Sequence, residues 1–572
     1  MSSFLTQAQE SYVLQIEVTD TTFTQKELQN LIHYKKQLPT ENDRNKEIQS
    51  LLLNLYDHGY LTAHFDSLSQ DSLSLIAYLT IGDTYKWGVI TPGNVDEEIL
   101  SSIVFRDKLY NNKFIYFNSI VKLNRGIITY CENNGYPFAS VKLDSIRMEG
   151  NYISASLNLT KNIQVNIDSI VFKGDAKINP VYIHNYLGIS PGDLYNESQV
   201  KKIKARLKEL PFIKESKPFD IVFTESITKI IFYLENKKSS QLDGILGILP
   251  NNDISGKVLF TGDAHLKLQN SFGRGELIDV NWRKLQNQTQ DFNTQFIYPF
   301  LFSTPFGIDL KLDLYKRDTT FLNVSQMAGI QYLISGGNYF KVFIKSKNSS
   351  LLSSSGLENL SRLPNYADIK TILYGIGFKT EQLDYRINPR KGYKLIFNGG
   401  VGNRKITKHP KIKESLYENL ELTSTQYDLD LNIDYFIPVI KRSTLKLSSS
   451  SAYLSGKSSF ENELFRIGGL KSLRGFDEES IFASTYSIMT VELRYLLEQN
   501  SYAHVFWNGA YYENTSINFT GDRYDTPYGF GAGVSFETKA GIFSISYALG
   551  KQFNNPILLR AGKVHFGIVS YF

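Results

Sequence analysis

The chain has 572 residues and a formal net charge of +5, and 13% of its residues are aromatic, with 36 Tyr and 37 Phe but only 3 Trp. This length exceeds one ordinary domain, and the small net charge without a basic block argues against a nucleic-acid partner. One Cys excludes an intrachain disulfide, and one Cys with eight scattered His offers no ligand cluster for a metal, so no metal or cofactor is expected.

The first ten residues, 1–10, resemble the end of a secretory signal peptide, with Ala8 at the small-residue cleavage position. No basic start or full apolar run precedes Ala8. We therefore predict that residues 1–10 are the remnant of a signal peptide. An ordinary disordered N-terminus is the alternative.

Residues 11–238 show a mixed α/β pattern that repeats. Apolar residues recur at helical spacing, for example Ile48, Leu51 and Leu55. Each second helix ends at a breaker, and these ends lie roughly 75 residues apart, which is a repeat of domain size. The pattern predicts three units with the order strand, helix, helix, strand, strand. Their predicted bounds are 11–83, 84–162 and 163–238.

From residue 239 to residue 572 the pattern changes to strands that alternate apolar residues with polar or small ones. Tyr427 and Leu429, for example, alternate with Asp428 and Asp430. No stretch reaches the roughly 18 to 20 apolar residues of a membrane helix, so only a closed barrel remains if this part spans a membrane. The segment holds roughly 16 strands of about 10 residues with their turns. We predict an all-β antiparallel transmembrane barrel over 239–572.

The inner face of these strands carries Gly and Ser, whereas a soluble β-sandwich would place more Lys and Glu there. Gly529, Gly531 and Gly533 resemble a dinucleotide loop, yet no helix follows, so we interpret them as a smooth lumenal wall. Asp428 and Asp430 are expected to be solvated neighbours. Because nucleophile elbows, phosphate loops and zinc-protease motifs are absent from the sequence, we predict that the chain is not an enzyme.

The segment that follows the predicted eleventh strand is unusual for a long barrel loop. Gly468 and Gly469 precede the string Leu-Arg-Gly-Phe, which ends with Arg474, Gly475 and Phe476. A loop folded back into the lumen explains this string, because a shielded arginine needs a carboxylate on the barrel wall. Gly475 permits a tight turn, and Phe476 is expected to anchor the tip. An ordinary polar loop is the alternative.

This string resembles the inward-folded extracellular loop of the BamA/TamA family of outer-membrane assembly and translocation barrels. The segments 135–141 and 172–175, within the order βααββ, resemble the POTRA (polypeptide-transport-associated) repeat of the same family. The last strand resembles the C-terminal signal of outer-membrane barrels at His565, Gly567 and Phe572. The resemblance covers nearly the whole chain and implies three α+β POTRA repeats followed by the barrel.

In this family the lumenal arginine pairs with acids on the barrel wall, which implies a partner for Arg474. The alternation of residues 490–495 directs Glu492 inward, and we place it on strand twelve as that partner. Asn508, on strand thirteen, stands where relatives generally have Asp, so this chain has one charge fewer in the cluster. Residues 388–393 are interpreted as a turn without a functional role.

The resemblance also implies a weakly paired seam between the first and last barrel strands, at which a client strand can be templated. The seam would join residues 244–249 to residues 563–572. Gly244 and Gly247 weaken the first of these strands. The implied function is insertion of outer-membrane proteins, which the periplasmic POTRA domains deliver to the seam. Three repeats are fewer than usual for BamA and favour the accessory TamA-like branch.

The implied partners are unfolded outer-membrane or surface proteins, outer-membrane lipids and a periplasmic or inner-membrane partner reached through the POTRA-like units. The implied location is the outer membrane of a Gram-negative bacterium. Two alternatives stay open, a two-partner-type secretion pore and a passive porin or receptor barrel with periplasmic binding domains. A surface enzyme fused to a barrel is a third alternative, but the sequence contains no set of catalytic residues that supports it.

Overall fold

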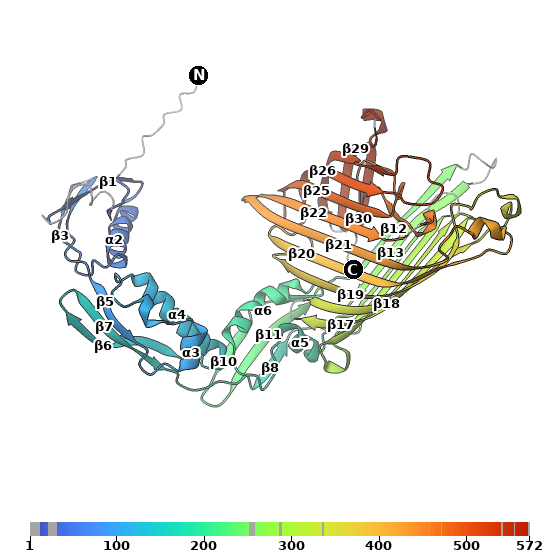
Figure 1. Ribbon diagram of the computed structural model, residues 1–572. Coiled ribbons are helices and arrows are strands. Elements are labelled where there is room, and N and C mark those ends of the chain that lie inside the picture. The colour runs from blue at the N-terminus through green and yellow to red at the C-terminus, as the bar shows by residue number, and fades with distance from the viewer. Residues whose placement is uncertain are drawn as a thin grey trace, which may run out of the picture. The chain divides into compact units, whose positions relative to one another are not determined.

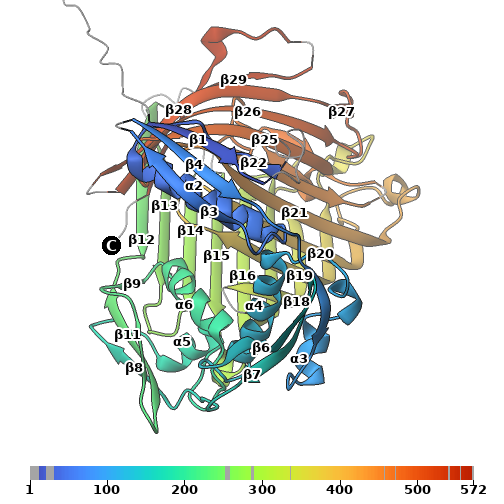
Figure 2. The ribbon, with the colours of Figure 1, turned by 90° about the vertical axis from the view of Figure 1, so that its left-hand side faces the viewer.

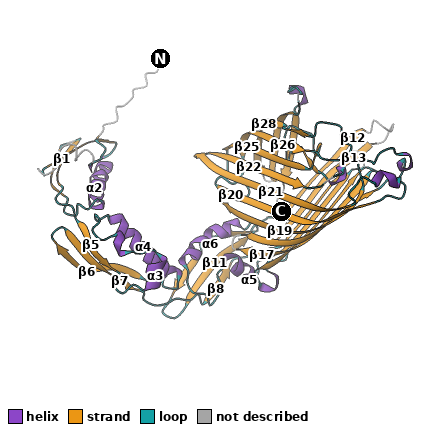
Figure 3. Ribbon diagram, viewed as in Figure 1, coloured by secondary structure: helices purple, strands orange, loops and turns teal. Residues whose placement is uncertain are grey.

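The computed structural model describes residues 12–20, 31–71, 73–250, 258–284, 289–334, 337–456, 458–470, 472–538, 541–553 and 555–569. The predicted signal-peptide remnant and the terminal Phe572 lie outside these residues. The chain divides into two compact units, residues 1–168 with 192–201 and residues 169–191 with 202–572. Figure 1 labels the elements along the chain, and Figure 3 colours them by type.

Among the described residues, a four-stranded sheet with one helix begins the first unit. Its elements are β1 (Tyr12–Val18), β2 (Gln37–Leu38), α2 (Glu41–Asp57), β3 (His64–Gln70) and β4 (Ser74–Thr80). The strand order is β2-β1-β4-β3, and β1 and β4 are parallel. Helix α2 buries Ile48, Leu51 and Leu55, which recur on one face. The Thr40 hydroxyl caps its first turn by accepting a hydrogen bond from the Asp43 amide at 3.1 Å.

A three-stranded sheet with two helices completes the first unit. Its elements are β5 (Lys86–Thr91), α3 (Glu97–Ser102), α4 (Phe117–Asn133), β6 (Ser140–Glu149) and β7 (Tyr152–Thr160). The strand order is β5-β7-β6, which leaves β6 at an edge. Helix α4 buries Ile120, Leu123, Ile127 and Cys131 against this sheet. Burial raises the pKa of the Cys131 thiol.

The second unit begins with another α/β sheet, as the repeat in the sequence predicts. Its elements are β8 (Ser169–Lys173), α5 (Pro180–Leu187), α6 (Glu197–Glu209), β9 (Ile213–Glu215), β10 (Asp220–Phe223) and β11 (Thr228–Asn236). Strand β11 lies between β10 and β8 and is parallel to β8. Within the described residues, none of the helices is long and apolar enough to cross a membrane.

A large antiparallel sheet forms the rest of the second unit, and Figure 2 shows several of its strands side by side. Its strands are β12 (Gln241–Pro250), β13 (Val258–Gln269), β14 (Leu277–Lys284), β15 (Gln290–Tyr298), β16 (Phe306–Arg317), β17 (Phe321–Ile334), β18 (Asn338–Leu351), β19 (Asp368–Leu383), β20 (Gly392–Thr407), β21 (Thr423–Ile440), β22 (Ser443–Leu454), β25 (Thr485–Leu496), β26 (Tyr502–Glu513), the two-residue β27 (Tyr524–Asp525), β28 (Tyr528–Thr538), β29 (Gly541–Lys551) and β30 (Lys563–Val569). Apart from β27 this makes 16 strands, the predicted number.

The two faces of the large sheet differ in the way that the sequence predicts for a membrane barrel. On β25, Val491 and Leu493 are 38% and 45% exposed, whereas Glu492 and Arg494 are 5% and 8% exposed. Exposed apolar side chains therefore cover the outer face, and the polar side chains lie inside.

Polar residues on the inner face of the large sheet form ion pairs with one another. Asp428 on β21 accepts hydrogen bonds from Lys345 and Lys347 on β18, at 3.1 and 2.6 Å. The prediction that Asp428 is only a solvated neighbour of Asp430 is therefore wrong. Two strands lie between β18 and β21 in the sheet, so long side chains meet across the curvature of the wall.

The sheet begins at β12 and ends at β30, and these two strands approach each other, with Cα atoms within 8 Å. Among the described residues, no backbone ladder joins them. Every other neighbouring pair of long strands in the sheet is joined by an antiparallel ladder.

Candidate functional site

The long connection between β22 and β25 folds inside the barrel, and we call residues 455–484 the lumenal loop. A short two-stranded stem, β23 (Phe465–Ile467) and β24 (Ile481–Ala483), organises it. The segment between the two stem strands, residues 468–480, is the tip. Polar side chains of the loop reach wall strands from β14 to β26, which places the loop in the lumen.

The tip turns on the two glycines that the sequence analysis singled out. Gly468 and Gly469 have φ of +119° and +92°, a region that side chains other than glycine rarely adopt. The Gly468 amide donates a hydrogen bond to the Ser472 hydroxyl at 2.8 Å, and the Gly469 amide donates to the Leu473 carbonyl at 3.1 Å. These bonds close a compact turn that presents Arg474 to the wall.

Arg474 is the centre of the predicted site, and its side chain is 11% exposed. Its Nη1 donates a hydrogen bond to Glu492 Oε2 at 2.8 Å, and its Nε donates to Asn508 Oδ1 at 3.1 Å. The guanidinium carbon lies 3.4 Å from the centroid of the Phe506 ring, in cation–π geometry. The structure thus brings together Arg474, Glu492 and Asn508, three residues that the sequence analysis selected.

Arg494 of β25 shares the Glu492 carboxylate with Arg474, and Asn388 in the β19–β20 connection contacts Arg494. Arg494 donates from Nε to Glu492 Oε1 at 2.8 Å and from Nη1 to Asn388 Oδ1 at 3.0 Å. Glu492 therefore lies between two guanidinium groups. Sequence analysis missed Asn388, which it assigned to a turn. Asn388 is 3% exposed, and the Asn-Pro pair carried no signal of a lumenal contact.

Glycines on both sides of the contact allow the tip to approach the wall. Gly475 has φ of +96°, and a Cβ there would lie 2.7 Å from the Leu549 carbonyl oxygen. A Cβ on Gly529 of β28 would overlap the Arg474 carbonyl oxygen. The smooth wall expected at Gly529 is thus the place where the tip lies against the barrel. Phe476 is 9% exposed and packs with Leu473 in an apolar cluster at the tip.

The tip also touches the last strand of the sheet. The Gly475 amide donates a hydrogen bond to His565 Nε2 at 3.4 Å. Asp477 accepts a hydrogen bond from Lys563 at 2.7 Å. A Cβ on Gly567 would lie 3.8 Å from the Leu470 side chain. Two residues of the predicted terminal signal, His565 and Gly567, therefore lie beside the lumenal loop.

The first strand of the sheet, β12, contains the two predicted seam glycines. Gly244 and Gly247 are register partners of Ala264 and Thr261 on β13. They lie on the same strand at the open edge of the sheet, but no described contact brings them to the Arg474 cluster. The described residues include no group of three or more His, Cys, Asp or Glu side chains that could hold a metal ion.

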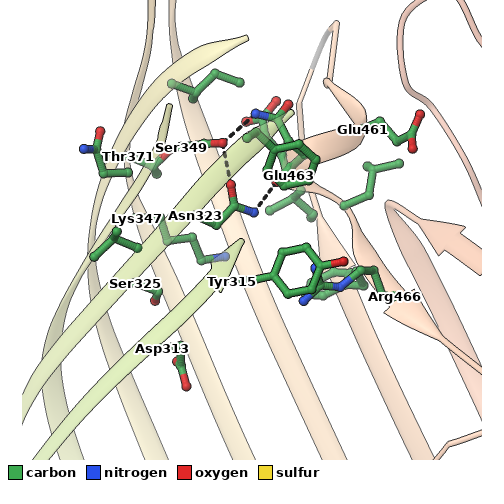
Figure 4. A pocket seen from close by; sticks show the side chains of 18 of the residues that line it. Asp313, Tyr315, Asn323, Ser325, Lys347, Ser349, Thr371, Glu461, Glu463 and Arg466 are labelled. Carbon is green, nitrogen blue, oxygen red and sulfur yellow. Dashed lines mark hydrogen bonds between the residues drawn. The ribbon is translucent and has the colours of Figure 1, made fainter. Parts of the chain in front are cut away.

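A cavity of about 360 Å³ lies between the loop and wall strands that include β15 to β19 (Figure 4). Asp313, Tyr315 and Lys347 line it from the wall, and Glu463 and Arg466 line it from the loop. The Arg466 guanidinium carbon lies 3.2 Å from the centroid of the Tyr315 ring. The lumen is thus divided by the loop, and no sequence pattern pointed to this second side.

Two family models match the chain. The Omp85 superfamily domain matches residues 270–572, more than half of the chain. The POTRA model, described as a surface antigen variable number repeat, matches residues 165–215, within the third α/β sheet and its helices. A search of curated proteins gives no match.

Two solved CdiB structures support the same fold. CdiB from Acinetobacter baumannii is similar with a TM-score of 0.52 and 14% identity, over 92% of this chain and 98% of that chain. CdiB from Escherichia coli is similar with a TM-score of 0.52 and 12% identity, over 93% of this chain and 99% of that chain. BamA from Haemophilus ducreyi lacking POTRA domains 1–3 aligns with a TM-score of 0.43 and 14% identity, over 86% and 99%.

These matches confirm the architecture that the sequence predicts, a POTRA region followed by a barrel sheet of the Omp85 superfamily. The chain belongs to the Omp85 superfamily.

Proposed function

We propose that this chain inserts other outer-membrane proteins into the membrane by templating their strands at the seam between β12 and β30. The observation that carries the proposal is the open edge: β12 and β30 approach each other without a ladder among the described residues. An unpaired strand edge is costly in lipid, since the backbone groups find no water there. A client strand that pairs with such an edge gains main-chain hydrogen bonds without any requirement for its sequence.

Two features of the seam support this proposal. Gly244 and Gly247 lie on β12, and glycine in a strand interior weakens the strand. The tip of the lumenal loop contacts β30 through His565 and Lys563. Movement of the tip is therefore coupled by direct contact to one of the two strands that form the seam.

The α/β units supply the proposed route for clients. Strand β6 is an edge strand, and Ile146 and Met148 on it are each 63% exposed. An extended client can add to such an edge before it reaches the barrel. We place the barrel in the outer membrane and these units in the periplasm. The proposed partners are unfolded outer-membrane or surface proteins, outer-membrane lipids and a periplasmic or inner-membrane protein.

A reversible crosslink across the seam tests the proposal. Cysteines placed at residues 246–248 of β12 are paired in turn with cysteines at residues 563–567 of β30, in a Cys131→Ala background. Purified protein in liposomes receives a urea-denatured eight-stranded outer-membrane barrel, and its folding is followed by the shift in electrophoretic mobility before heating. We expect the oxidised seam pair to slow client folding at least tenfold, and dithiothreitol to restore it.

A matched pair controls for the disulfide itself. Ser451 on β22 and Ser487 on β25 are register partners, and their hydroxyl oxygens lie 2.9 Å apart. Ser451→Cys with Ser487→Cys joins two strands that are already paired, so folding of the client should stay within twofold of the uncrosslinked rate. Full activity of the oxidised seam pair, or no crosslink at any seam position while the control pair forms, would overturn the proposal.

The same samples separate the two alternatives. A passive porin predicts a steady ion conductance that does not depend on residue 474. A secretion pore moves its substrate through the lumen, so a locked seam should leave transport intact. Loss of client insertion on seam oxidation is expected from strand templating alone.

A further inference from the structure

The lumenal loop contacts the barrel at a second place, which the tip motif does not explain. We call Glu461, Asn462 and Glu463 the rim segment, because their wall partners lie at the ends of strands β16, β17, β18 and β20. Those partners are Arg317, Asn323, Ser349 and Arg404. None of these four wall residues contacts Arg474 or Glu492 in the described structure.

The Glu463–Arg404 pair is the centre of this second contact. Arg404 Nε donates to Glu463 Oε1 at 2.6 Å, and Arg404 Nη2 donates to Glu463 Oε2 at 2.7 Å. The pair is bidentate, and its side chains are 1% and 8% exposed. Two parallel charge-assisted bonds fix orientation as well as distance. Arg404 is more deeply buried than Arg474, whose side chain is 11% exposed.

Asn462 connects the rim segment to β17, to β18 and to the residue that precedes β19. Its Nδ2 donates to the Ser349 hydroxyl at 2.5 Å and to the Ala367 carbonyl at 2.8 Å. Its own carbonyl accepts a hydrogen bond from Asn323 Nδ2 at 2.7 Å. Asn462 is 4% exposed, so these bonds form away from competing water. Figure 4 shows Asn323 and Ser349 pointing toward the loop.

Apolar contact and a second ion pair reinforce the rim segment. Phe460 is fully buried in a cluster with Ile369, Ile406 and Tyr417. Arg317 Nη1 donates to Glu461 Oε1 at 2.8 Å. Burial of a phenylalanine side chain and several satisfied polar bonds act on the same four residues, 460–463.

The stem connects the rim segment to the tip. The stem strands β23 and β24 pair through Arg466 and Phe482. The two glycines with positive φ, Gly468 and Gly469, come directly after the stem. Backbone rotation there can displace the tip while the stem hydrogen bonds stay intact.

We propose that the rim segment is a second anchor of the lumenal loop and that it acts independently of Arg474. Arg404 and Asn462 are positioning residues in this scheme, and the stem stays across the lumen when the tip leaves Glu492. The loop is thus a fixed plug with a releasable tip. This inference concerns the lumen and holds whether or not the seam templates clients.

Cysteine accessibility tests this independence on the full chain in nanodiscs, in the Cys131→Ala background. Ser459→Cys reports on the rim and Leu473→Cys on the tip, since these side chains are 1% and 0% exposed. Glu463→Gln should raise maleimide labelling at 459 at least tenfold and change labelling at 473 by less than threefold. Arg474→Ala should raise labelling at 473 at least tenfold and change labelling at 459 by less than threefold.

Two further variants guard against general damage. Arg404→Gln combined with Glu463→Gln replaces the ion pair with an amide pair, and labelling at 459 should be at least threefold slower than in Glu463→Gln alone. Glu414→Gln, in an exposed ion pair with Lys408, should leave both rates within twofold. Heat-modifiable mobility verifies that each barrel is folded, and Asn462→Ala replaces any variant that fails this check.

The outcomes divide cleanly between two descriptions of the loop. Separate responses at 459 and 473 support two anchors. If Glu463→Gln releases the tip as strongly as the rim, or if Arg474→Ala releases the rim, the loop moves as one body and the proposal is wrong. Unchanged labelling at 459 in both Glu463→Gln and Asn462→Ala would also overturn it.

Discussion

Replacing Arg474 with alanine is the most direct perturbation of the lumenal loop. The change removes the 2.8 Å hydrogen bond to Glu492, the 3.1 Å hydrogen bond to Asn508 and the cation–π contact with Phe506. From the sequence alone we expect Arg474→Ala to free the loop and reduce function while the barrel stays folded. The rim contacts, together with the ion pair between Arg283 and Glu479 at 2.7 Å, narrow this expectation to the part of the tip around Arg474.

The free energy that Arg474→Ala costs the closed tip depends on the contacts that Glu492 keeps after the substitution. A hydrogen bond to a charged group contributes about 1.5–3 kcal/mol, and a desolvated cation–π contact contributes about 1–2 kcal/mol. Glu492 keeps its bond to Arg494 at 2.8 Å, so it is not left unpaired. The loss therefore stays below the roughly 3–5 kcal/mol of a fully broken buried pair. We expect about 3 kcal/mol, which is roughly a 100-fold change in the open population of the tip.

Maleimide labelling of Leu473→Cys measures that population. Leu473 is fully buried, so the thiol reacts only when the tip opens, and the rate scales with the opening equilibrium. Arg474→Ala should raise the rate roughly 100-fold, and client folding in liposomes should fall with it. Arg560→Ala is the matched control, because Arg560 is exposed in the β29–β30 connection. In this variant, labelling of Leu473→Cys should stay within twofold of the rate without the Arg560 substitution.

A rise of less than threefold in the labelling rate of Leu473→Cys on the Arg474→Ala substitution would refute this prediction. It would mean that the contacts of Arg474 contribute little beyond what water supplies to the free side chain. A large rise in labelling with unchanged client folding would leave the physical argument intact and remove the tip from the proposed mechanism.

Three further changes test other parts of the structure. Asn508→Asp adds a carboxylate 3.1 Å from Arg474 Nε, so labelling at the tip should slow about threefold to tenfold. Gly529→Ala places a Cβ against the Arg474 carbonyl oxygen, and this overlap should cost about 1–3 kcal/mol, seen as faster tip labelling in an unchanged barrel. Ile127→Ala empties a fully buried site in the core of the second α/β sheet, and it should lower the free energy of unfolding by about 2–5 kcal/mol. The urea transition of Trp87 fluorescence in the same core measures this change. A decrease below about 1 kcal/mol would contradict the packing.

The sequence by itself determined the repeated α/β order and the strand count, because both rest on local periodicity. Apolar residues at helical spacing produced α2 and α4, and alternation produced the barrel strands. It also led to Arg474 and Glu492, because an arginine that follows a Gly-Gly turn in an inward-folded loop needs an inward carboxylate, and alternation reveals which carboxylates face inward.

Only the tertiary structure decided which distant side chains meet in the lumen. Arg404 lies 59 residues before its partner Glu463, and neither residue stands in a pattern that differs from an ordinary strand or loop. Asn388 and Asp428 were likewise interpreted as turn and solvated residues, yet both are buried in lumenal contacts. The physical reason is that periodicity fixes which face a residue occupies, whereas pairing across the lumen depends on strand register and on the path of the loop.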